Sequence, residues 1–513
     1  MADIVYRANL ATASFPFLSE LFGRSIIVKQ QDQNVVKALA PGEAGGDDLG
    51  IPQLYYCHNV IPTDSGYKSV GYTEINGIQY PASKNLNNVL TLRDSNGNSA
   101  QITTDALGGV FLLLEGTTAW GTGTNPPNPA LIIDKRMTVA FVSGTTYIYF
   151  ESVGCYTYDF ATNTFSTQAL AGLTAADVLG LIANRGYMIA YTDVAVFWSS
   201  TTDPTDFVPS LITGAGGGQL EGARGRIVTI ESVYGGFITF TAGNAVSAIA
   251  SDNARFPYNF MEITGCGGLA DPNFVSYDSN SASVYAYTTS GLQAVSLRQA
   301  VIVFPEVTDF ISGGLIEDFD ETALVLSIAG TAGAVLKKKL VIVASRYLVI
   351  SYGIGALTHA LYYDGLLKQW GRLKFTHTDC FEWNRSGTEI PKKSLAFLGA
   401  SGSLHVLNTD INAPATNGIM IVGKFQYVRT RLLQLQRVAL ENIETSGNTF
   451  WLYDLPALDG KNFGTAIIGY LAANHTKYRE YLFHNTAMNH SLLFKGQFHA
   501  VSLVLTFNVS GQR

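Results

Sequence analysis

The chain has 513 residues, of which 14% are charged and 12% are aromatic, and its formal net charge is −7. This length exceeds what one small core needs, so we expect two or three domains or one large repeat domain. The acidic balance disfavours tight nucleic-acid binding, because phosphate-binding surfaces carry an excess of Lys and Arg. The 51 Gly, 26 Tyr and 28 Phe residues are typical of strands and turns, so the sequence predicts an all-β protein.

Residues 1–80 predict an N-terminal arm and a docking hairpin. The arm contains the loop-like run ALAPGEAGGDDLG. A strand-like segment, YYCHNVI, then meets Pro62, and the chain turns at Asp64–Gly66 before Tyr67 continues the strand. We expect Asn59, Pro62, Gly66 and Tyr67 to hold this shaped turn for assembly.

Residues 81–410 repeat one pattern of aromatic strand, polar turn and aromatic strand. Cys155–Phe165 and Leu361–Leu373 both place an Asp at the end of one strand and an aromatic residue at the start of the next. In the second copy these residues are Asp364, which can bond the turn backbone, and Trp370, which fits a half-buried strand. Strand pairs recur about every 40–50 residues, which predicts a β-propeller-like domain of about six to seven blades.

Helical and glycine-rich segments are few. Thr174–Asn184 predicts a short helix with Thr174 as its N-cap, and Phe17–Phe22 predicts a single helical turn. The run Gly214–Gly218 lacks the spaced glycines and the following helix of a phosphate-binding loop, so we expect a loop between blades.

Residues 411–513 predict a separate C-terminal β-sandwich. The region begins with the linker-like run INAPATNG and continues with long strand patterns, among them Arg431–Ile443 and Phe498–Val509. We interpret four histidines in this region as ordinary surface residues rather than a pH-sensitive interface. They are His475, His484, His490 and His499.

Cysteine spacing and hydropathy argue against zinc-binding, secreted and membrane-spanning proteins. The four cysteines contain no C-x-x-C pair, which argues against a zinc knuckle and favours buried free thiols in a reducing compartment. They are Cys57, Cys155, Cys266 and Cys380. The start of the chain lacks the basic and apolar segments of a secretory signal. The most apolar segment, Leu340–Tyr363, is interrupted by Arg346 and Gly353, so it predicts two strands rather than a membrane span.

Two clusters contain metal-ligating residue types. The acidic run Ile316–Glu321 lacks the spacing and the glycine of an EF-hand, so a solvated loop is favoured over a calcium site. In His377–Cys380, strand alternation points His377 and Asp379 to one face and Cys380 to the other, which disfavours a metal centre. We therefore predict no metal and no cofactor.

A propeller that hydrolyses glycosides would need two neighbouring carboxylates. Five Asp residues are candidates, but each lies beside turn residues, where Asp bonds the backbone. They are Asp159, Asp203, Asp206, Asp278 and Asp364. Turn roles are favoured, and we predict that the protein is not an enzyme. Lys337–Lys339 is interpreted as a charged edge strand rather than a DNA contact.

Three parts of the chain resemble the tail nozzle proteins of short-tailed bacteriophages, also called tail hub or phage stabilisation proteins. They are Asn59–Pro62 with Gly66–Gly71, Trp198–Ser200 with Asp203–Phe207, and Leu361–Leu373. The likeness covers most of the chain in order. Many relatives carry Arg-Pro-Gly where this chain has Ser69-Val70-Gly71, so that turn departs from the family pattern.

The resemblance implies a virion structural protein, located in the tail after assembly in the host bacterial cytoplasm. Its expected partners are further copies of itself in a ring, commonly a hexamer, the portal and adaptor ring, and tail spike, fibre or needle proteins. DNA would pass through the bore during ejection with transient, non-specific contact. Two alternatives stay open: a receptor- or glycan-binding virion propeller, and a propeller glycoside hydrolase.

Overall fold

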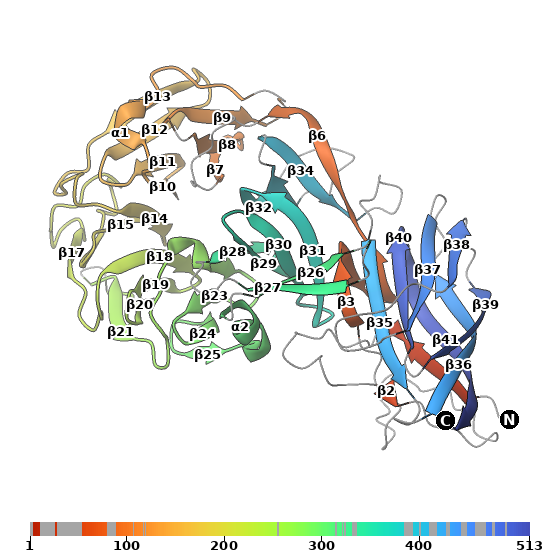
Figure 1. Ribbon diagram of the computed structural model, residues 1–513. Coiled ribbons are helices and arrows are strands. Elements are labelled where there is room, and N and C mark those ends of the chain that lie inside the picture. Colours follow the sequence, from red (N-terminus) through yellow and green to blue (C-terminus); the bar gives the residue numbers. More distant parts are fainter. Residues whose placement is uncertain are drawn as a thin grey trace.

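The computed structural model describes residues 4–10, 26–27, 54–79, 89–105, 107–115, 117, 120–253, 256–312, 315–320, 322, 325–330, 336–383, 393–399, 402–409, 418–426, 431–442, 449–456, 468–473, 478–487 and 490–512. Strands dominate these residues, which confirms the all-β class. A ring of sheets lies beside a β-sandwich (Figure 1). Within the described ranges, no helix has the length and apolar character needed to cross a membrane.

Seven antiparallel units form the blades of a propeller (Figure 1). The first is β7 (Leu90–Arg93), β8 (Ser99–Thr104) and β9 (Val110–Leu114). The second is β10 (Met137–Val142), β11 (Thr145–Phe150), β12 (Gly154–Asp159) and β13 (Thr164–Gln168). The third is β14 (Gly180–Asn184), β15 (Tyr187–Tyr191), β16 (Ala195–Trp198) and β17 (Gly216–Gln219).

The remaining blades follow in chain order. The fourth is β18 (Ile227–Val233), β19 (Gly236–Thr241), β20 (Ala245–Ala250) and β21 (Tyr258–Glu262). The fifth is β22 (Val275–Asp278), β23 (Ser283–Thr288), β24 (Gly291–Val295) and β25 (Ala300–Ile302). The sixth is β28 (Leu336–Val343), β29 (Tyr347–Ile354), β30 (Leu357–Asp364) and β31 (Gln369–His377). The seventh is β32 (Asp379–Trp383), β33 (Ser394–Leu398), β34 (Ser403–Asn408) and β6 (Gly71–Gln79).

Hydrophobic clusters fill the seams between neighbouring blades and close the ring. Each of the seven seams contains one such cluster. In the closing seam, Leu113 of the first blade packs with Phe381 and Trp383 of the seventh. The seventh blade also joins distant parts of the chain, because β6 pairs with β34 in the register Val406↔Thr73. The propeller prediction is thereby confirmed, and the described strands form seven blades.

The repeated aromatic hairpin has the same register in both of its copies. Tyr158 faces Phe165 between β12 and β13, and Tyr363 faces Trp370 between β30 and β31. In each hairpin the Asp ends the first strand, as the sequence predicts. Aromatic pairs directly opposite each other stabilise antiparallel strands, which explains why the pattern recurs.

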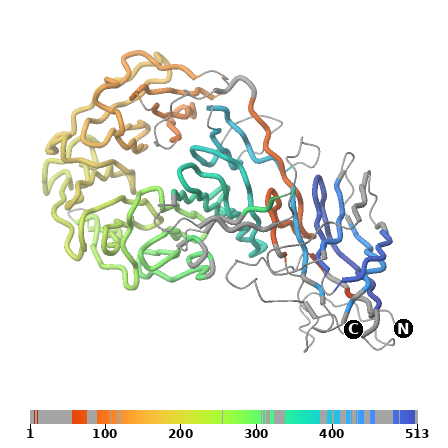
Figure 2. The backbone as a smooth tube through the Cα atoms, viewed as in Figure 1, coloured from red at the N-terminus to blue at the C-terminus, as the bar shows by residue number. Residues whose placement is uncertain are grey.

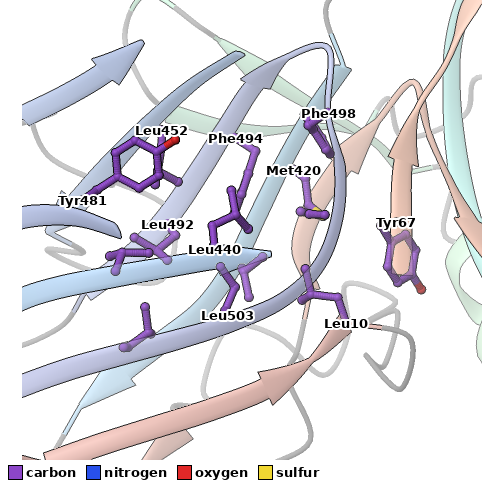
Figure 3. Packing of buried hydrophobic residues seen from close by; sticks show 14 of the residues in the cluster. Leu10, Tyr67, Met420, Leu440, Leu452, Tyr481, Leu492, Phe494, Phe498 and Leu503 are labelled. Atoms are coloured by element: carbon purple, nitrogen blue, oxygen red, sulfur yellow. The ribbon is translucent and has the colours of Figure 1, made fainter. Parts of the chain in front are cut away.

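A β-sandwich combines strands from both ends of the chain. One sheet contains β1 (Ile4–Asn9), β36 (Arg431–Asn442), β39 (Tyr478–Ala487) and β41 (His499–Gln512). The other contains β2 (Ile26–Ile27), β3 (Leu54–His58), β35 (Gly418–Gln426), β37 (Thr449–Pro456), β38 (Ile468–Ala473) and β40 (His490–Gly496). Figure 3 shows Leu440 and Leu503 of the first sheet beside Leu492 and Phe494 of the second. A sandwich in the C-terminal region is confirmed, but it is not separate, because β1, β2 and β3 from the N-terminal region belong to its sheets.

The N-terminal strands do not form a sheet of their own. β1 pairs with β41, and β3 pairs with β35, so the early and late parts of the chain lie together (Figure 2). The hairpin of β4 (Val60–Thr63) and β5 (Gly66–Ser69) joins β31 to β41 in a ten-stranded sheet. Residues 1–80 are therefore shared between the sandwich, this hairpin and the seventh blade.

Two local expectations were wrong. Thr174–Asn184 is a turn followed by β14, because Leu181 and its neighbours pair with β15 and Leu181 is buried in the seam with the second blade. Strand pairing and burial override the helical pattern there. Gly214–Gly218 belongs partly to β17, where a Cβ at Gly216 would lie 2.9 Å from the Trp198 ring. Glycine thus lets the outer strand cover that ring. Phe17–Phe22 lies outside the described residues.

Short helices and one extra hairpin complete the elements in the described part of the chain. The helices are α1 (Pro129–Ile132), η3 (Pro272–Phe274) and α2 (Pro305–Ser312). The hairpin of β26 (Leu315–Asp320) and β27 (Val325–Gly330) lies between the fifth and sixth blades in sequence. Its Phe319 packs with Tyr56 and Ile421 of the sandwich, so the propeller contacts the sandwich through a second element. All four cysteines are buried and free, as predicted.

Candidate functional site

The candidate site is the junction between propeller and sandwich. It consists of hairpin β4–β5 and the parts of β3, β26, β30, β31 and β41 beside it. Val60 pairs with Arg372 of β31, while Tyr67 and Lys68 pair with Ala500 and His499 of β41. The hairpin therefore connects a propeller blade to a sandwich sheet through backbone pairing. The segment YYCHNVI does not form one strand, because it changes sheets at Asn59.

Asn59 makes this change of sheet with a backbone in the left-handed region, at φ 52°. Asn is among the few residues that tolerate this conformation. Its Oδ1 accepts hydrogen bonds from the Tyr72 hydroxyl at 2.8 Å and from the Lys374 backbone N–H at 2.9 Å. Its carbonyl accepts the Val70 N–H at 2.9 Å. One buried side chain thus joins β31 and β6 to the hairpin.

Pro62 and Gly66 lie where the hairpin is closest to its neighbours. Pro62 faces Tyr67 across the hairpin, beyond the single paired position that β4 makes with β31. A strand position outside the ladder suits Pro, which has no N–H to donate. A Cβ on Gly66 would collide with the carbonyl oxygen of Ala500. Glycine therefore allows β41 to approach the turn.

Tyr67 and Trp370 connect the hairpin to the propeller wall. Tyr67 is fully buried, and its hydroxyl donates to the Trp370 carbonyl oxygen at 3.3 Å. The Trp370 indole lies 5.1 Å from the Phe304 ring and 4.8 Å from the Tyr363 ring, measured between centroids. The structure thus brings four of the predicted turn residues and Trp370 to one place. Their role in assembly stays a prediction.

Asp364 bonds the turn backbone, as predicted, but it also forms a buried ion pair that the sequence pattern did not predict. Its side chain is 2% exposed and forms a two-pronged pair with Arg346, at 2.9 Å from Nε and 2.6 Å from Nη2. The same carboxylate accepts the Leu366 N–H at 2.9 Å. The hydrogen bond to Asp364 raises the pKa of Arg346. A buried carboxylate with these partners holds the turn more firmly than an exposed one.

We expect Asp364→Ala to lower the free energy of unfolding by about 2–4 kcal/mol, because the change leaves a partly buried guanidinium and a turn N–H without their acceptor. Asp159→Ala is the matched control, since Asp159 occupies the same hairpin position but is exposed. Its loss is expected to stay below about 1 kcal/mol. Urea unfolding followed by circular dichroism measures both. Equal losses in the two variants would contradict the importance of the buried pair.

The junction also contains buried histidines and cations that sequence reasoning missed. Burial, together with the nearby charges of Lys374 and Arg372, lowers the pKa of His58 and His359 to about 3. The Arg372 guanidinium lies 5.5 Å from the Tyr56 ring, and Lys374 pairs with Asp318 of β26. A His inside the apolar run YYCHNVI was the available signal, because alternation places His58 and Tyr56 on the same face of the strand.

The other His and acidic candidates have structural partners. His490 is fully buried, and its Nδ1 lies 2.9 Å from Asp454 Oδ2, so the surface interpretation was wrong for it. It was also wrong for His499, whose Nε2 contacts the Thr63 hydroxyl at 2.8 Å in the junction. His484 is exposed as expected. His475 lies outside the described residues.

The acidic run and the His377–Cys380 cluster do not converge on a metal. Residues 316–320 lie in β26 rather than in a loop, because they pair along β27. His377 ends β31 and contacts the Ser351 hydroxyl at 2.6 Å, while Asp379 begins β32 and pairs with Lys339. Cys380 is buried in the seam. Among the described residues, no three His, Cys, Asp or Glu side chains gather around a metal position.

The remaining candidates, four Asp residues and a run of Lys residues, bond turn backbones or lie at a sheet edge and a seam. Asp159, Asp203, Asp206 and Asp278 each accept a backbone N–H two residues ahead. Asp159 and Asp278 lie in separate turns, while Asp203 and Asp206 share one turn, closed by the Asp206 N–H to the Asp203 carbonyl oxygen at 3.1 Å. Because each carboxylate bonds the turn backbone, the turn interpretation is supported over a paired-acid site. β28 is the edge strand of its sheet, as expected for Lys337–Lys339. Lys339 nevertheless points into the seam with the seventh blade through its pair with Asp379.

No protein-family model and no curated protein matches this chain. Solved structures that resemble it include the extracellular domain of a proposed one component system from B. thetaiotaomicron, at 10% identity and a TM-score of 0.40, covering 89% of this chain and 63% of that chain. This chain therefore spans less than two thirds of that structure.

Two further solved structures resemble part of this chain. YCF48 from Cyanidioschyzon merolae is 12% identical with a TM-score of 0.39, covering 66% of this chain and 99% of that one. The WD40 β-propeller domain of Doa1 is 10% identical with a TM-score of 0.34, covering 66% of this chain and 98% of that one. Such distant likenesses say nothing of function. The propeller assignment rests on the sheets and the hydrophobic seams of this structure.

Proposed function

We propose that the protein is a structural component of a bacteriophage tail, a nozzle subunit whose copies form a ring below the portal and adaptor. The observation that carries the proposal is the junction. The residues of the nozzle-like motif, Asn59, Pro62, Gly66 and Tyr67, are the ones that tie the propeller to the sandwich. A wall subunit needs its two bodies held at one angle, and backbone pairing across the junction supplies that rigidity.

Charge is consistent with this role. A net charge of −7 does not favour counterion release from DNA, so DNA could pass a wall of such subunits with transient contact only. The turn roles of the Asp residues give no support to a glycoside hydrolase. Spike, fibre or needle proteins would bind the outer parts of the ring.

Electron microscopy of the purified full chain tests the proposal. We expect rings with a central hole, commonly of six copies, alone at high concentration or after mixing with portal–adaptor complexes. The test variant is Asn59→Ala, which removes the acceptor of two hydrogen bonds at the junction. If the junction sets the angle of the two bodies, this variant forms fewer or irregular rings. A monodisperse monomer that also fails to join portal–adaptor complexes would overturn the proposal.

A further inference from the structure

The closing seam of the propeller contains a cavity of about 40 Å³ between the first blade and Trp383 of β32. This volume exceeds the roughly 10–15 Å³ that one water molecule needs. Three strands of the first blade contribute one face of the wall, in two cross-strand rows. The rows are Thr91, Gln101 and Leu113, and next to them Arg93, Ser99 and Glu115.

The opposite face of the same three strands is apolar. Leu92, Ile102 and Leu112 point into the hydrophobic seam with the second blade. The polar rows therefore face the cavity because of strand alternation, and a polar face turned toward a seam is unusual for a propeller core. Leu113 alone on this face joins the hydrophobic cluster of the closing seam.

Two residues that line the cavity, one from each blade, carry a buried polar atom. Gln101 is 7% exposed and Trp383 is 2% exposed. Gln101 Oε1 and Trp383 Nε1 have no hydrogen-bond partner among the described residues. Buried polar groups in native proteins are nearly always bonded, so an acceptor and a donor left together suggest a ligand that supplies both complements.

We propose that this cavity binds the acetamido group of an N-acetylated sugar. A trans secondary amide directs its N–H and its C=O to opposite sides, which matches an acceptor on one blade and a donor on the other. The N–H would donate to Gln101 Oε1, and the C=O would accept from Trp383 Nε1. The methyl group would lie against Leu113.

The rim of the cavity favours a sugar over a peptide amide. Thr91, Arg93, Glu115 and Thr117 are exposed around the opening, and Ser99 Oγ donates to Glu115 Oε2 at 2.6 Å. Several donors and acceptors around one amide position suit a ring that carries hydroxyls. One Arg and one Glu leave the rim without net charge, which suits a neutral ligand. This inference is independent of the ring proposal.

The test uses the five tryptophans of the chain as reporters. The full chain is labelled with 15N-tryptophan, and the Trp383 indole signal is assigned with Trp383→Phe. N-acetylglucosamine and N-acetylgalactosamine are titrated to tens of millimolar, with glucose as the probe that lacks the amide. We expect at least one N-acetylated sugar to shift the Trp383 signal, and glucose to bind at least tenfold more weakly.

Variants distinguish a sugar-binding site from a packing defect in the closing seam. Gln101→Leu removes the acceptor at similar volume and should weaken sugar binding at least tenfold, whereas the midpoint of thermal unfolding should not fall, because a buried unpaired amide is removed. Trp451→Phe, which changes an exposed indole of the sandwich, should leave binding unchanged. The proposal is overturned if neither sugar shifts the Trp383 signal, if glucose binds equally well, or if N-methylacetamide binds as tightly as the sugars.

Discussion

Lowering the pH from 7 to 5 is expected to reduce the free energy of unfolding by about 4–8 kcal/mol, through four buried histidines that stay neutral in the folded state. Burial lowers the pKa of His58 and His359 to about 3, and that of His377 and His499 to about 4. Each contributes about 1–2 kcal/mol of this loss by pH 5. The total approaches the whole stability of an ordinary domain.

The sign follows from proton binding. The unfolded chain binds a proton at each of these histidines near pH 6.5, whereas the folded chain binds it only near pH 3 or 4. Stability therefore falls as the pH falls below about 6.5, and the histidine contribution levels off below the folded values. Because three of the four lie in the junction, we expect acid to separate the propeller from the sandwich first.

Urea unfolding between pH 7 and pH 5 measures this effect. His359→Gln should reduce the mean slope of stability against pH by about 0.5–1 kcal/mol per pH unit over this range, since one titrating group is removed. His484→Gln changes an exposed histidine and should leave the slope as it is. A midpoint of unfolding that is independent of pH over this range would show that the four side chains are not buried in their neutral form.

Trp370→Ala is expected to lower the free energy of unfolding by about 3–5 kcal/mol, as for other buried aromatic residues replaced by Ala. The indole is 6% exposed and packs with Phe304, Tyr363 and Leu361 in the seam between the fifth and sixth blades. Its removal leaves a cavity in that seam. The Tyr67 hydroxyl would keep its acceptor, because it bonds the backbone carbonyl of residue 370.

Chemical unfolding followed by far-UV circular dichroism measures the Trp370→Ala effect. Trp451→Ala serves as the control, because that side chain is 40% exposed, and its loss should cost less than about 1 kcal/mol. If both variants lose the same stability, Trp370 does not hold the seam. Comparison with Asp364→Ala then distinguishes the contribution of Trp370 packing from that of the buried Asp364–Arg346 pair. We expect the two losses in the free energy of unfolding to be similar.

Local patterns predicted the parts of the fold that depend on neighbours in sequence. An aromatic strand, an Asp-containing turn and a second aromatic strand specify one hairpin, and Tyr158 and Tyr363 show the same register in the structure. Turn chemistry and alternation act within a few residues, so repeats, blades and the late strands could be recognised without tertiary information.

The sequence alone thus determined an all-β chain, its hairpin repeat and a sandwich region. Tertiary structure decided the rest. Only long-range pairing divides YYCHNVI between two sheets at Asn59, makes β14 from a helix-like segment, and buries His490, His499 and Asp364. It also brings Gln101 and Trp383, from two different blades, to one cavity in the closing seam. The physical reason is that strand periodicity says which residues share a face, whereas the partner of that face comes from residues far along the chain.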